Sequence, residues 1–447
     1  MFLKSGKTIF FLKVFIPAFI LMSCDTFLGN PETPPLPGER ISILKLNQEL
    51  AEDPNLSDLK ISLPEPIQNQ DWAQDGGAAN HNMQHVTLPE NLEKIWSIRV
   101  GQSANSERKF LTSPIVAYNR VYTLDPSLIL SSIDATTGKF FWRIDLTTAG
   151  EQDDLFGGGL AVADNKIFIT TPFAKIFALD ALTGDLLWET AVQGPIKSSP
   201  VVVKDKLFAI TIDNQLIALS TETGDKLWTH SAVSDSPGLL GGSTPAAEEN
   251  TVIVPYNSGE VFALRSENGR ILWSENMTVV NSTEDQTLLS SIRAKPVIDK
   301  DQVIVMSNNG ILASIDLRRG VRLWDANIAG TQTPWVAGNF IYVISSNNEL
   351  ICLLREDGRI RWIQSLPVYE DEEERSTPIS WFGPILAGDR LIITGSDGTA
   401  LSISPYTGEI LSQQIISDHM SVAPIVAENK LFFLDDRGRI TSFQQPQ

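Results

Sequence analysis

LDALTGDLLW, at residues 179–188, is one copy of a motif that occurs seven times in this chain of 447 residues. Each copy has an apolar residue, then a short polar turn that ends in Gly, and six copies have a Trp four residues after that Gly. The copies are IDATTGKFFW (133–142), LDALTGDLLW (179–188), LSTETGDKLW (219–228), LRSENGRILW (264–273), IDLRRGVRLW (315–324), LLREDGRIRW (353–362) and ISPYTGEILS (403–412). Six intervals separate Gly138 from Gly408, so the mean period is 45 residues. A period of this length with several short strands per unit is typical of a β-propeller.

Each unit contains four predicted strands, which we expect to run from the inside of the ring to the outside. The motif Gly closes a tight hairpin where the backbone needs a positive φ. Two strands precede each motif, for example residues 206–211 and 215–219. The first strand of each unit consists of small residues and is usually preceded by a Pro. A Pro at this position does not weaken the sheet, because no backbone N–H is needed there for hydrogen bonding between strands. These Pro residues are Pro114, Pro200, Pro245, Pro296, Pro334, Pro384 and Pro424, whereas the second unit has Gly157, Gly158 and Gly159 instead.

The number of strands predicts how the ring closes. Eight segments match the second strand of a unit: 121–124, 166–170, 206–211, 251–254, 302–306, 340–344, 390–394 and 430–434. Only seven outer strands follow them, because the eighth unit ends near Phe443. Residues 92–100 (LEKIWSIRV) supply the missing strand, with Trp96 at the Trp position. The sequence therefore predicts an all-β protein, an eight-bladed propeller of four-stranded antiparallel blades, in which the N-terminal strand pairs with the C-terminal blade and leaves no open edge.

The repeated tryptophans are interpreted as structural residues that wedge between neighbouring blades, and ligand contact is the alternative. An indole buries a large apolar area wherever it packs. The tryptophans are Trp96, Trp142, Trp188, Trp228, Trp273, Trp324 and Trp362. Ser412 stands at the eighth position, so we expect its seam to be the loosest of the ring.

The first residues have the pattern of a bacterial lipoprotein signal peptide. Lys4, Lys7 and Lys13 precede an apolar run at 14–22, which is too short to span a membrane as a helix. The run ends in Leu-Met-Ser and then Cys24, which resembles the lipobox of lipoproteins. That resemblance implies a signal peptide at 1–23 and a lipid on Cys24; an ordinary secretion signal with an incidental Cys is the alternative. Asp25 leaves open whether the inner or the outer membrane retains the protein.

The composition changes after about residue 90. Residues 24–90 are predicted to be the lipidated Cys and a flexible tether and lead-in, rich in Pro between 31 and 37, with at most a short helix near 43–51. Within this part, residues 71–77 are expected to be more ordered, with Trp72 packed against the propeller. Residues 91–447 are predicted to form the propeller.

Charge and cysteine content exclude several classes of protein. The chain carries a formal net charge of −19, which becomes −22 when residues 1–23 and their three Lys are removed. Such a surface repels nucleic acid and anionic lipid headgroups. Cys352 is the only Cys besides Cys24. It is expected to be a buried thiol. If Cys24 is lipidated, no disulfide can form within a monomer, and stability must come from blade packing.

The sequence contains no recognisable catalytic, cofactor or metal site. The four His, at 81, 85, 230 and 419, lack ligand spacing and an obvious nucleophile nearby. His81 and His85 are interpreted as solvated. The acidic run at 370–374 is interpreted as a solvated loop, because calcium loops need Gly and alternating carboxylates. Gly157 to Gly159 lack the Lys and Ser/Thr of a phosphate cradle.

The repeats resemble the pyrroloquinoline-quinone-like propeller family, and lipobox, tether and eight blades together resemble its BamB branch, over essentially residues 24–443. This resemblance implies a non-enzymatic scaffold lipoprotein of the β-barrel assembly (BAM) complex, on the periplasmic face of the outer membrane. It implies binding to the POTRA domains of BamA and to other BAM subunits, as a monomer within a hetero-complex, without cofactor or nucleic acid. We expect this complex to aid the insertion of outer-membrane proteins.

Two loops match the positions that contact BamA in the family, at residues 235–242 and 287–293. Apolar side chains at loop tips suggest a protein partner; capping of the propeller's own core is the alternative. The candidate partner-binding residues are Leu239, Leu240, Gly241, Leu288, Leu289, Ser291 and Arg293. Ser291 and Arg293 stand where enteric relatives carry acidic residues, which puts the charge pairing with BamA in doubt.

Two other classes of protein stay open. One is a pyrroloquinoline-quinone-dependent dehydrogenase. Such enzymes resemble this chain in their repeats, but they are larger and typically carry adjacent cysteines over the cofactor and a Glu/Asn/Asp calcium set; this sequence has no adjacent cysteines. The other is a lipid-anchored propeller that binds a different periplasmic partner, such as a cell-wall polymer. Quinone absorbance and dye-linked activity would identify the first class, and co-purification would identify the second.

Overall fold

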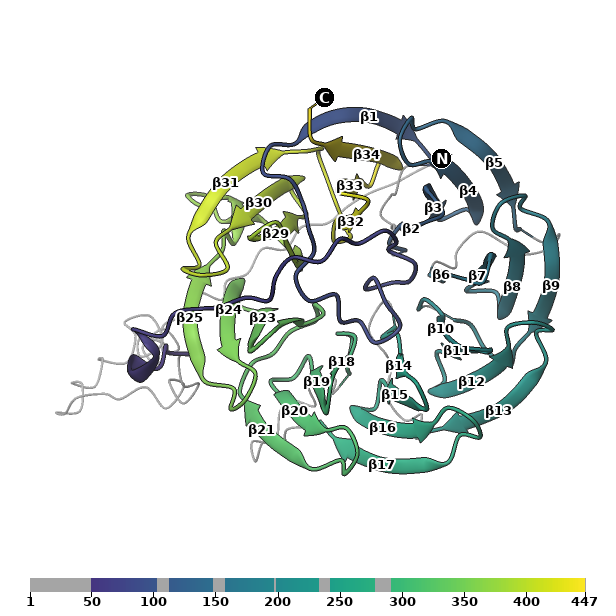
Figure 1. Ribbon diagram of the computed structural model, residues 1–447, viewed down its shortest axis with the longest axis horizontal. Helices are drawn as coiled ribbons and strands as arrows, with labels where there is room; N and C mark the ends of the chain where they lie inside the picture. Colours follow the sequence, from purple (N-terminus) through teal and green to yellow (C-terminus); the bar gives the residue numbers. More distant parts are fainter. Residues whose placement is uncertain are drawn as a thin grey trace, which may run out of the picture. The chain divides into compact units, whose positions relative to one another are not determined.

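The computed structural model describes residues 50–102, 112–147, 157–196, 198–232, 242–277 and 291–446. The chain divides into two compact units, Met1–Glu49 and Leu50–Gln447, of which the second is described here. Its described residues form eight four-stranded antiparallel sheets arranged as the blades of a ring (Figure 1). The predicted all-β, eight-bladed propeller is therefore confirmed. The described residues contain no helix of the length and apolar character needed to cross a membrane.

In blades 1 to 7 the strands follow the chain order from the centre outwards. Blades 1 to 4 comprise β2 (Ile115–Ala117), β3 (Arg120–Leu124), β4 (Ile129–Asp134), β5 (Phe140–Asp145); β6 (Gly159–Ala163), β7 (Lys166–Thr170), β8 (Lys175–Asp180), β9 (Leu186–Ala191); β10 (Val201–Val203), β11 (Lys206–Ile210), β12 (Gln215–Ser220), β13 (Lys226–Ser231); and β14 (Ala246–Glu248), β15 (Thr251–Pro255), β16 (Glu260–Arg265), β17 (Ile271–Asn276). Blades 5 to 7 comprise β18 (Val297–Asp299), β19 (Gln302–Met306), β20 (Leu312–Asp316), β21 (Arg322–Ala326); β22 (Trp335–Ala337), β23 (Phe340–Ile344), β24 (Glu349–Leu354), β25 (Ile360–Ser365); and β28 (Trp381–Ala387), β29 (Arg390–Gly395), β30 (Thr399–Ile403), β31 (Ile410–Ile415).

The eighth blade joins the two ends of the propeller. Its inner strands are β32 (Ile425–Ala427), β33 (Lys430–Leu434) and β34 (Arg439–Gln444), and its outer strand is β1 (Glu93–Arg99). β1 pairs antiparallel with β34, and Trp96 lies opposite Ser442. The predicted closure by the N-terminal strand is confirmed. Outside the ring, β26 (Tyr369–Asp371) and β27 (Ser376–Pro378) form an exposed hairpin around the acidic run, and Pro54–Leu56 form a 3-10 helix.

The motif Gly has two structural functions, which Gly224 illustrates. Its φ is +74°, a region that residues with a Cβ rarely adopt. A Cβ built there would also lie 2.6 Å from Cε3 of Trp188, the indole of the preceding blade. Gly therefore closes its own hairpin and leaves space for the neighbouring Trp, which explains why the two residues recur together.

Each repeated Trp in the described residues connects its blade to the next one. The indole N–H donates to a backbone carbonyl in the hairpin that follows, at 2.8–3.3 Å. The acceptors, in ring order from Trp96, belong to Ala135, Leu182, Thr221, Ser266, Leu317, Arg355 and Pro405. Five of these indoles also contact an aromatic ring on the second strand of their own blade, as Trp362 contacts Tyr342 at 5.9 Å between centroids.

The seam between blades 7 and 8 differs from the others. Ser412 on β31 takes the Trp position and pairs with Ser402, and all six residues of β31 are exposed. The usual hairpin is absent too, because β34 and β1 come from opposite ends of the chain. A groove of about 530 Å³ lies here, lined by Ser402 and Ser412 from blade 7 and by Leu431, Phe433 and Phe443 from blade 8.

One expectation about the inner strands is wrong at a single position. Six of the seven Pro residues directly precede their strand, as Pro200 precedes β10. Pro384 instead lies inside β28, which begins three residues earlier, at Trp381. The pairing of β28 with β29 shifts register between Phe382 and Ile385. Pro384 is therefore tolerated because it sits in a break of the ladder, where no donor is required.

Residues 69–86, called the central segment below, cross the middle of the ring and hydrogen bond to all eight blades (Figure 1). The contacts follow ring order. They join Asn69 to Glu428 and Val426, Trp72 to Val116, Ala73 to Val162, Gln74 to Val202, Ala79 to Ala247, Asn80 to Ile298, Gln84 to Gly338, and Val86 to Leu386 and Gly388. The segment thus satisfies backbone groups on the innermost strands, which would otherwise be unpaired edges.

The central segment was only partly predicted. Trp72 packs against the propeller as expected: it is 3% exposed and stacks on Trp335 with 6.3 Å between ring centroids. His81 and His85 are buried, not solvated as predicted. The Nδ1 of each ring donates to a backbone carbonyl oxygen at 2.8 Å, of Pro296 and Pro64 respectively. The predicted helix near 43–51 lies mostly outside the described residues, and residues 50 and 51 are not helical.

Candidate functional site

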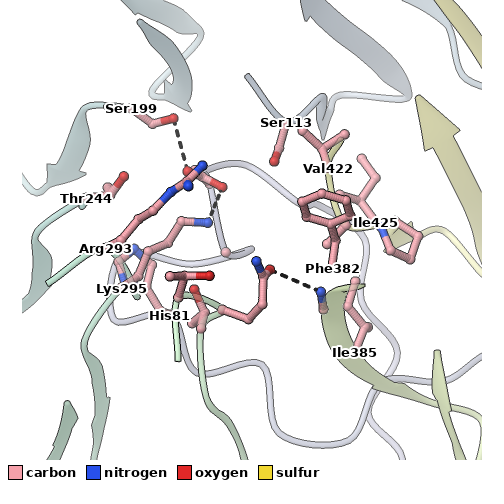
Figure 2. A pocket seen from close by; sticks show the side chains of 18 of the residues that line it. His81, Ser113, Ser199, Thr244, Arg293, Lys295, Phe382, Ile385, Val422 and Ile425 are labelled. Atoms are coloured by element: carbon pink, nitrogen blue, oxygen red, sulfur yellow. Dashed lines mark hydrogen bonds and ion pairs between the residues drawn. The ribbon is translucent and has the colours of Figure 1, made fainter. Parts of the chain in front are cut away.

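A pocket of about 160 Å³ lies at the centre of the ring, between the central segment and the inner ends of the blades. Trp72, Asp75, Gly76 and His81 of the central segment form part of its wall. The rest comes from the residues just before or within inner strands. Those drawn in Figure 2 include Ser113, Ser199, Thr244, Arg293, Lys295, Phe382, Ile385, Val422 and Ile425.

The polar side of the pocket is built by blades 3 to 5 (Figure 2). Lys295 Nζ lies 2.5 Å from Asp75 Oδ1, and Ser199 Oγ donates to Asp75 Oδ2 at 3.2 Å. Burial alone would raise the pKa of the Asp75 carboxyl, but the Lys295 ammonium outweighs burial, so that pKa lies below its usual range. Asp75 is therefore an ionised, fully engaged carboxylate that fastens the central segment to blades 3 and 5.

Arg293 lines the pocket beside this ion pair, and no carboxylate of the described residues pairs with it. It has no hydrogen-bond or ion-pair partner among the described residues. Burial lowers the pKa of its guanidinium below the usual range, and no carboxylate offsets that effect. The guanidinium is therefore a partly desolvated cation that lines the pocket.

His81 contributes no charge at neutral pH. Its Nδ1 lies 2.8 Å from the carbonyl oxygen of Pro296, and its Nε2 is buried without a hydrogen-bond partner. Burial, helped by the nearby Lys295 ammonium, lowers the pKa of His81 to about 4. The charged groups that line the pocket in the described ranges are thus two cations, Arg293 and Lys295, and one carboxylate, Asp75.

The opposite side of the pocket is apolar and comes from blades 7 and 8 (Figure 2). Phe382 and Ile385 lie on β28, and Val422 and Ile425 lie at the entry to β32. Gln332 contacts the first part of β28, because its side-chain oxygen accepts a hydrogen bond from Gly383 N at 3.4 Å. The pocket is therefore amphipathic, with cations facing hydrocarbon across the ring axis.

Two of the predicted partner-binding residues can be placed, and both lie near this pocket. Arg293 lines it, and Ser291 is buried with no hydrogen-bond partner for its hydroxyl. Leu239, Leu240, Gly241, Leu288 and Leu289 lie outside the described residues, as does Cys24. The two segments that follow the candidate loops meet, because Ser243 Oγ donates to the carbonyl oxygen of Ala294 at 3.0 Å. The ends of the two loops, just before β14 and β18, therefore lie side by side.

The described residues offer no arrangement of the usual catalytic or metal-binding kind. No group of three or more His, Cys, Asp or Glu among them could hold a metal ion. Cys352 is a free, buried thiol, as predicted, and burial raises its pKa well above the usual range, so it is not an activated nucleophile. What the central pocket can do chemically is bind, through charge at one side and apolar contact at the other.

Comparison with known sequences points to one family. A family model described as outer membrane protein assembly factor BamB matches residues 126–364. Outer membrane protein assembly factor BamB of Escherichia coli (strain K12) is 30% identical over 352 residues, which cover 78% of this chain and 87% of that protein. The Yersinia pestis protein of the same description is 27% identical over 356 residues, covering 78% and 88%.

Comparison with solved structures agrees on the fold. BamB from Moraxella catarrhalis has a TM-score of 0.67 at 18% identity, covering 79% of this chain and all of that one. A europium-containing methanol dehydrogenase has a TM-score of 0.66 at 16% identity, covering 84% of this chain and 98% of the enzyme. At such low identity these structures show the shared propeller and do not distinguish a scaffold from an enzyme.

Proposed function

Because the chain belongs to the family of outer membrane protein assembly factor BamB, and its relatives support a role in outer membrane protein assembly, we propose that it acts there as a non-enzymatic scaffold. In this proposal the propeller is held at the periplasmic face of the outer membrane by a lipid on Cys24. Its partners are the POTRA domains of BamA and other BAM subunits. The match to the family over residues 126–364 is the observation that carries the proposal.

The proposed contact surface is formed by the candidate loops before β14 and β18. Their apolar tips, Leu239 and Leu240 in one loop and Leu288 and Leu289 in the other, would provide the buried centre of an interface. The hydrogen bond from Ser243 to Ala294 supports this assignment, because it holds the ends of the two loops together on one side of the ring. The absence of an activated nucleophile or metal cluster in the described residues fits a binding role.

Co-purification tests the proposal. Leu239→Asp combined with Leu289→Asp should reduce recovery of BamA with the detergent-solubilised protein by at least tenfold, because two charges would be buried at the centre of the contact. The matched control is Leu187→Asp combined with Leu227→Asp, two exposed positions on the outer strands β9 and β13. Equal recovery of BamA with both double variants would refute the proposed surface.

A second measurement tests the non-enzymatic part. The purified protein should show no quinone absorbance and no dye-linked alcohol dehydrogenase activity after incubation with pyrroloquinoline quinone and Ca²⁺. Activity under these conditions would assign the chain to the enzymatic propellers.

A further inference from the structure

The guanidinium of Arg293 has neither a hydrogen-bond acceptor nor a carboxylate partner in the part of the chain that the structure describes. A cation taken out of water is costly unless a carboxylate or several acceptors surround it. The only carboxylate that lines the pocket in the described part of the chain is Asp75, and both of its oxygens are already used, by Lys295 and by Ser199. Among the described residues, the pocket therefore has one more positive charge than its carboxylates neutralise.

An excess of positive charge in the pocket is unusual for a protein that is acidic overall. The chain carries 54 acidic against 35 basic residues, so a carboxylate for Arg293 would be easy to provide. Two other cations with little exposure do have one: Arg355 pairs with Asp299 at 2.8 Å, and Lys430 pairs with Glu428 at 2.7 Å. Half-buried Arg390 has two backbone acceptors instead, the carbonyl oxygens of Pro89 and Glu90. A half-buried guanidinium that has no acceptor of either kind among the described residues is thus suited to an anion that comes from outside.

The wall opposite Arg293 limits what else that anion carries. Phe382, Ile385, Val422 and Ile425 offer hydrocarbon and aromatic surface, and the volume of about 160 Å³ accepts one ring or a short branched chain. An apolar cavity of about 150 Å³ is known to hold benzene. Two hydroxyls also line the pocket and could contact polar substituents: that of Thr244 on the side of Arg293, and that of Ser113 on the side of Val422 (Figure 2).

We propose that the central pocket binds a small organic carboxylate, with its carboxylate on the Arg293 guanidinium and its apolar body against Phe382 and Val422. A planar guanidinium pairs with a carboxylate through two parallel hydrogen bonds, which gives direction as well as charge. Neutral molecules of the same shape lack the group that Arg293 needs, and ammonium compounds are repelled by Arg293 and Lys295. This inference is independent of the scaffold role proposed above.

Titration with benzoate tests the proposal on the full-length chain in detergent, with protein-free detergent as the blank. We expect calorimetry to detect benzoate with a dissociation constant below 5 mM, and at least tenfold weaker binding of benzamide, benzylamine and acetate. Benzamide and benzylamine test the charge, and acetate tests the apolar wall. The proposal is overturned if benzoate does not bind, or if benzamide binds as well.

Variants assign the binding to Arg293. Arg293→Gln should weaken benzoate binding at least tenfold, Arg293→Lys should weaken it less, and the exposed control Arg318→Gln should leave it unchanged. Without ligand, Arg293→Gln should unfold at a temperature no lower than the wild type, because it removes a charge that has no partner; this also shows that the variant is folded. Unchanged benzoate binding by a folded Arg293→Gln would refute the site.

Discussion

Replacing Gln74 by Ala should destabilise the whole propeller, because this one side chain satisfies both backbone groups of an edge residue. Gln74 Nε2 donates to the carbonyl oxygen of Val202 at 2.9 Å, and Val202 N donates to Gln74 Oε1 at 2.9 Å. Both residues are buried. In the Ala variant the N–H and C=O of Val202 would face a void, and each unsatisfied buried group costs about 1–3 kcal/mol. We therefore expect the free energy of unfolding to fall by about 2–6 kcal/mol.

Two measurements check this expectation. Urea unfolding followed by tryptophan fluorescence gives the global change, and hydrogen exchange gives the local one, since the Val202 amide should lose protection. Gln215→Ala is the matched control: its amide makes one 3.4 Å bond to Ser231 at the surface, so its loss should cost less than about 0.5 kcal/mol. If Gln74→Ala changed stability no more than this control, the assignment of a structural role to the central segment would be wrong.

Two further predictions concern the seam and the pocket. Ser412→Trp should raise the free energy of unfolding by about 1–2 kcal/mol, because an indole would fill part of the groove beside Phe433 and Phe443. In the wild type, the amides of β31 should exchange with solvent faster than those of β25. Equal exchange rates, or a variant less stable than the wild type, would contradict a loose seam. His81 should make the protein less stable in mild acid. Its folded pKa of about 4 lies below the unfolded value near 6.5, so the unfolded chain binds the extra proton, and stability is lost as the pH falls from about 6.5 towards 4, by up to about 3 kcal/mol. Urea midpoints at pH 7 and pH 5 measure this loss, which His81→Asn should reduce; an unchanged pH dependence in that variant would show that other groups cause it.

The blades could be predicted from the sequence because their signal is local and repeated. The Gly and Trp of each motif recur for a geometric reason, since the Gly of one hairpin, such as Gly224, makes room for the Trp of the preceding blade, Trp188. Closure was predictable too, because Trp96 marks an outer strand without a blade of its own. Pro384 was misplaced because a strand can extend beyond its Pro when the ladder is already interrupted.

The central segment and the pocket carry no such signal. Its contacts are made largely by backbone groups of residues 69–86, so no periodicity marks them, and a Gly- and Asn-rich composition suggests exposure. His81 and His85 were expected to be solvated for that reason. Arg293 was singled out as a loop residue, but its isolation depends on Asp75, which lies 218 positions earlier and is itself occupied by Lys295.

The hydrogen bond between Asn69 and Val426 can form only late in folding, because the two residues lie far apart in the sequence. Asn69 contacts Val426, which lies 357 residues further along the chain, and the same segment needs every inner strand in between. In a protein synthesised from its amino end, residues 69–86 therefore cannot complete their hydrogen bonds to the inner strands until almost the whole chain has been made. Such long sequence separations are typical of slow folding, so a periplasmic chaperone would have most to protect during the interval before β32 arrives.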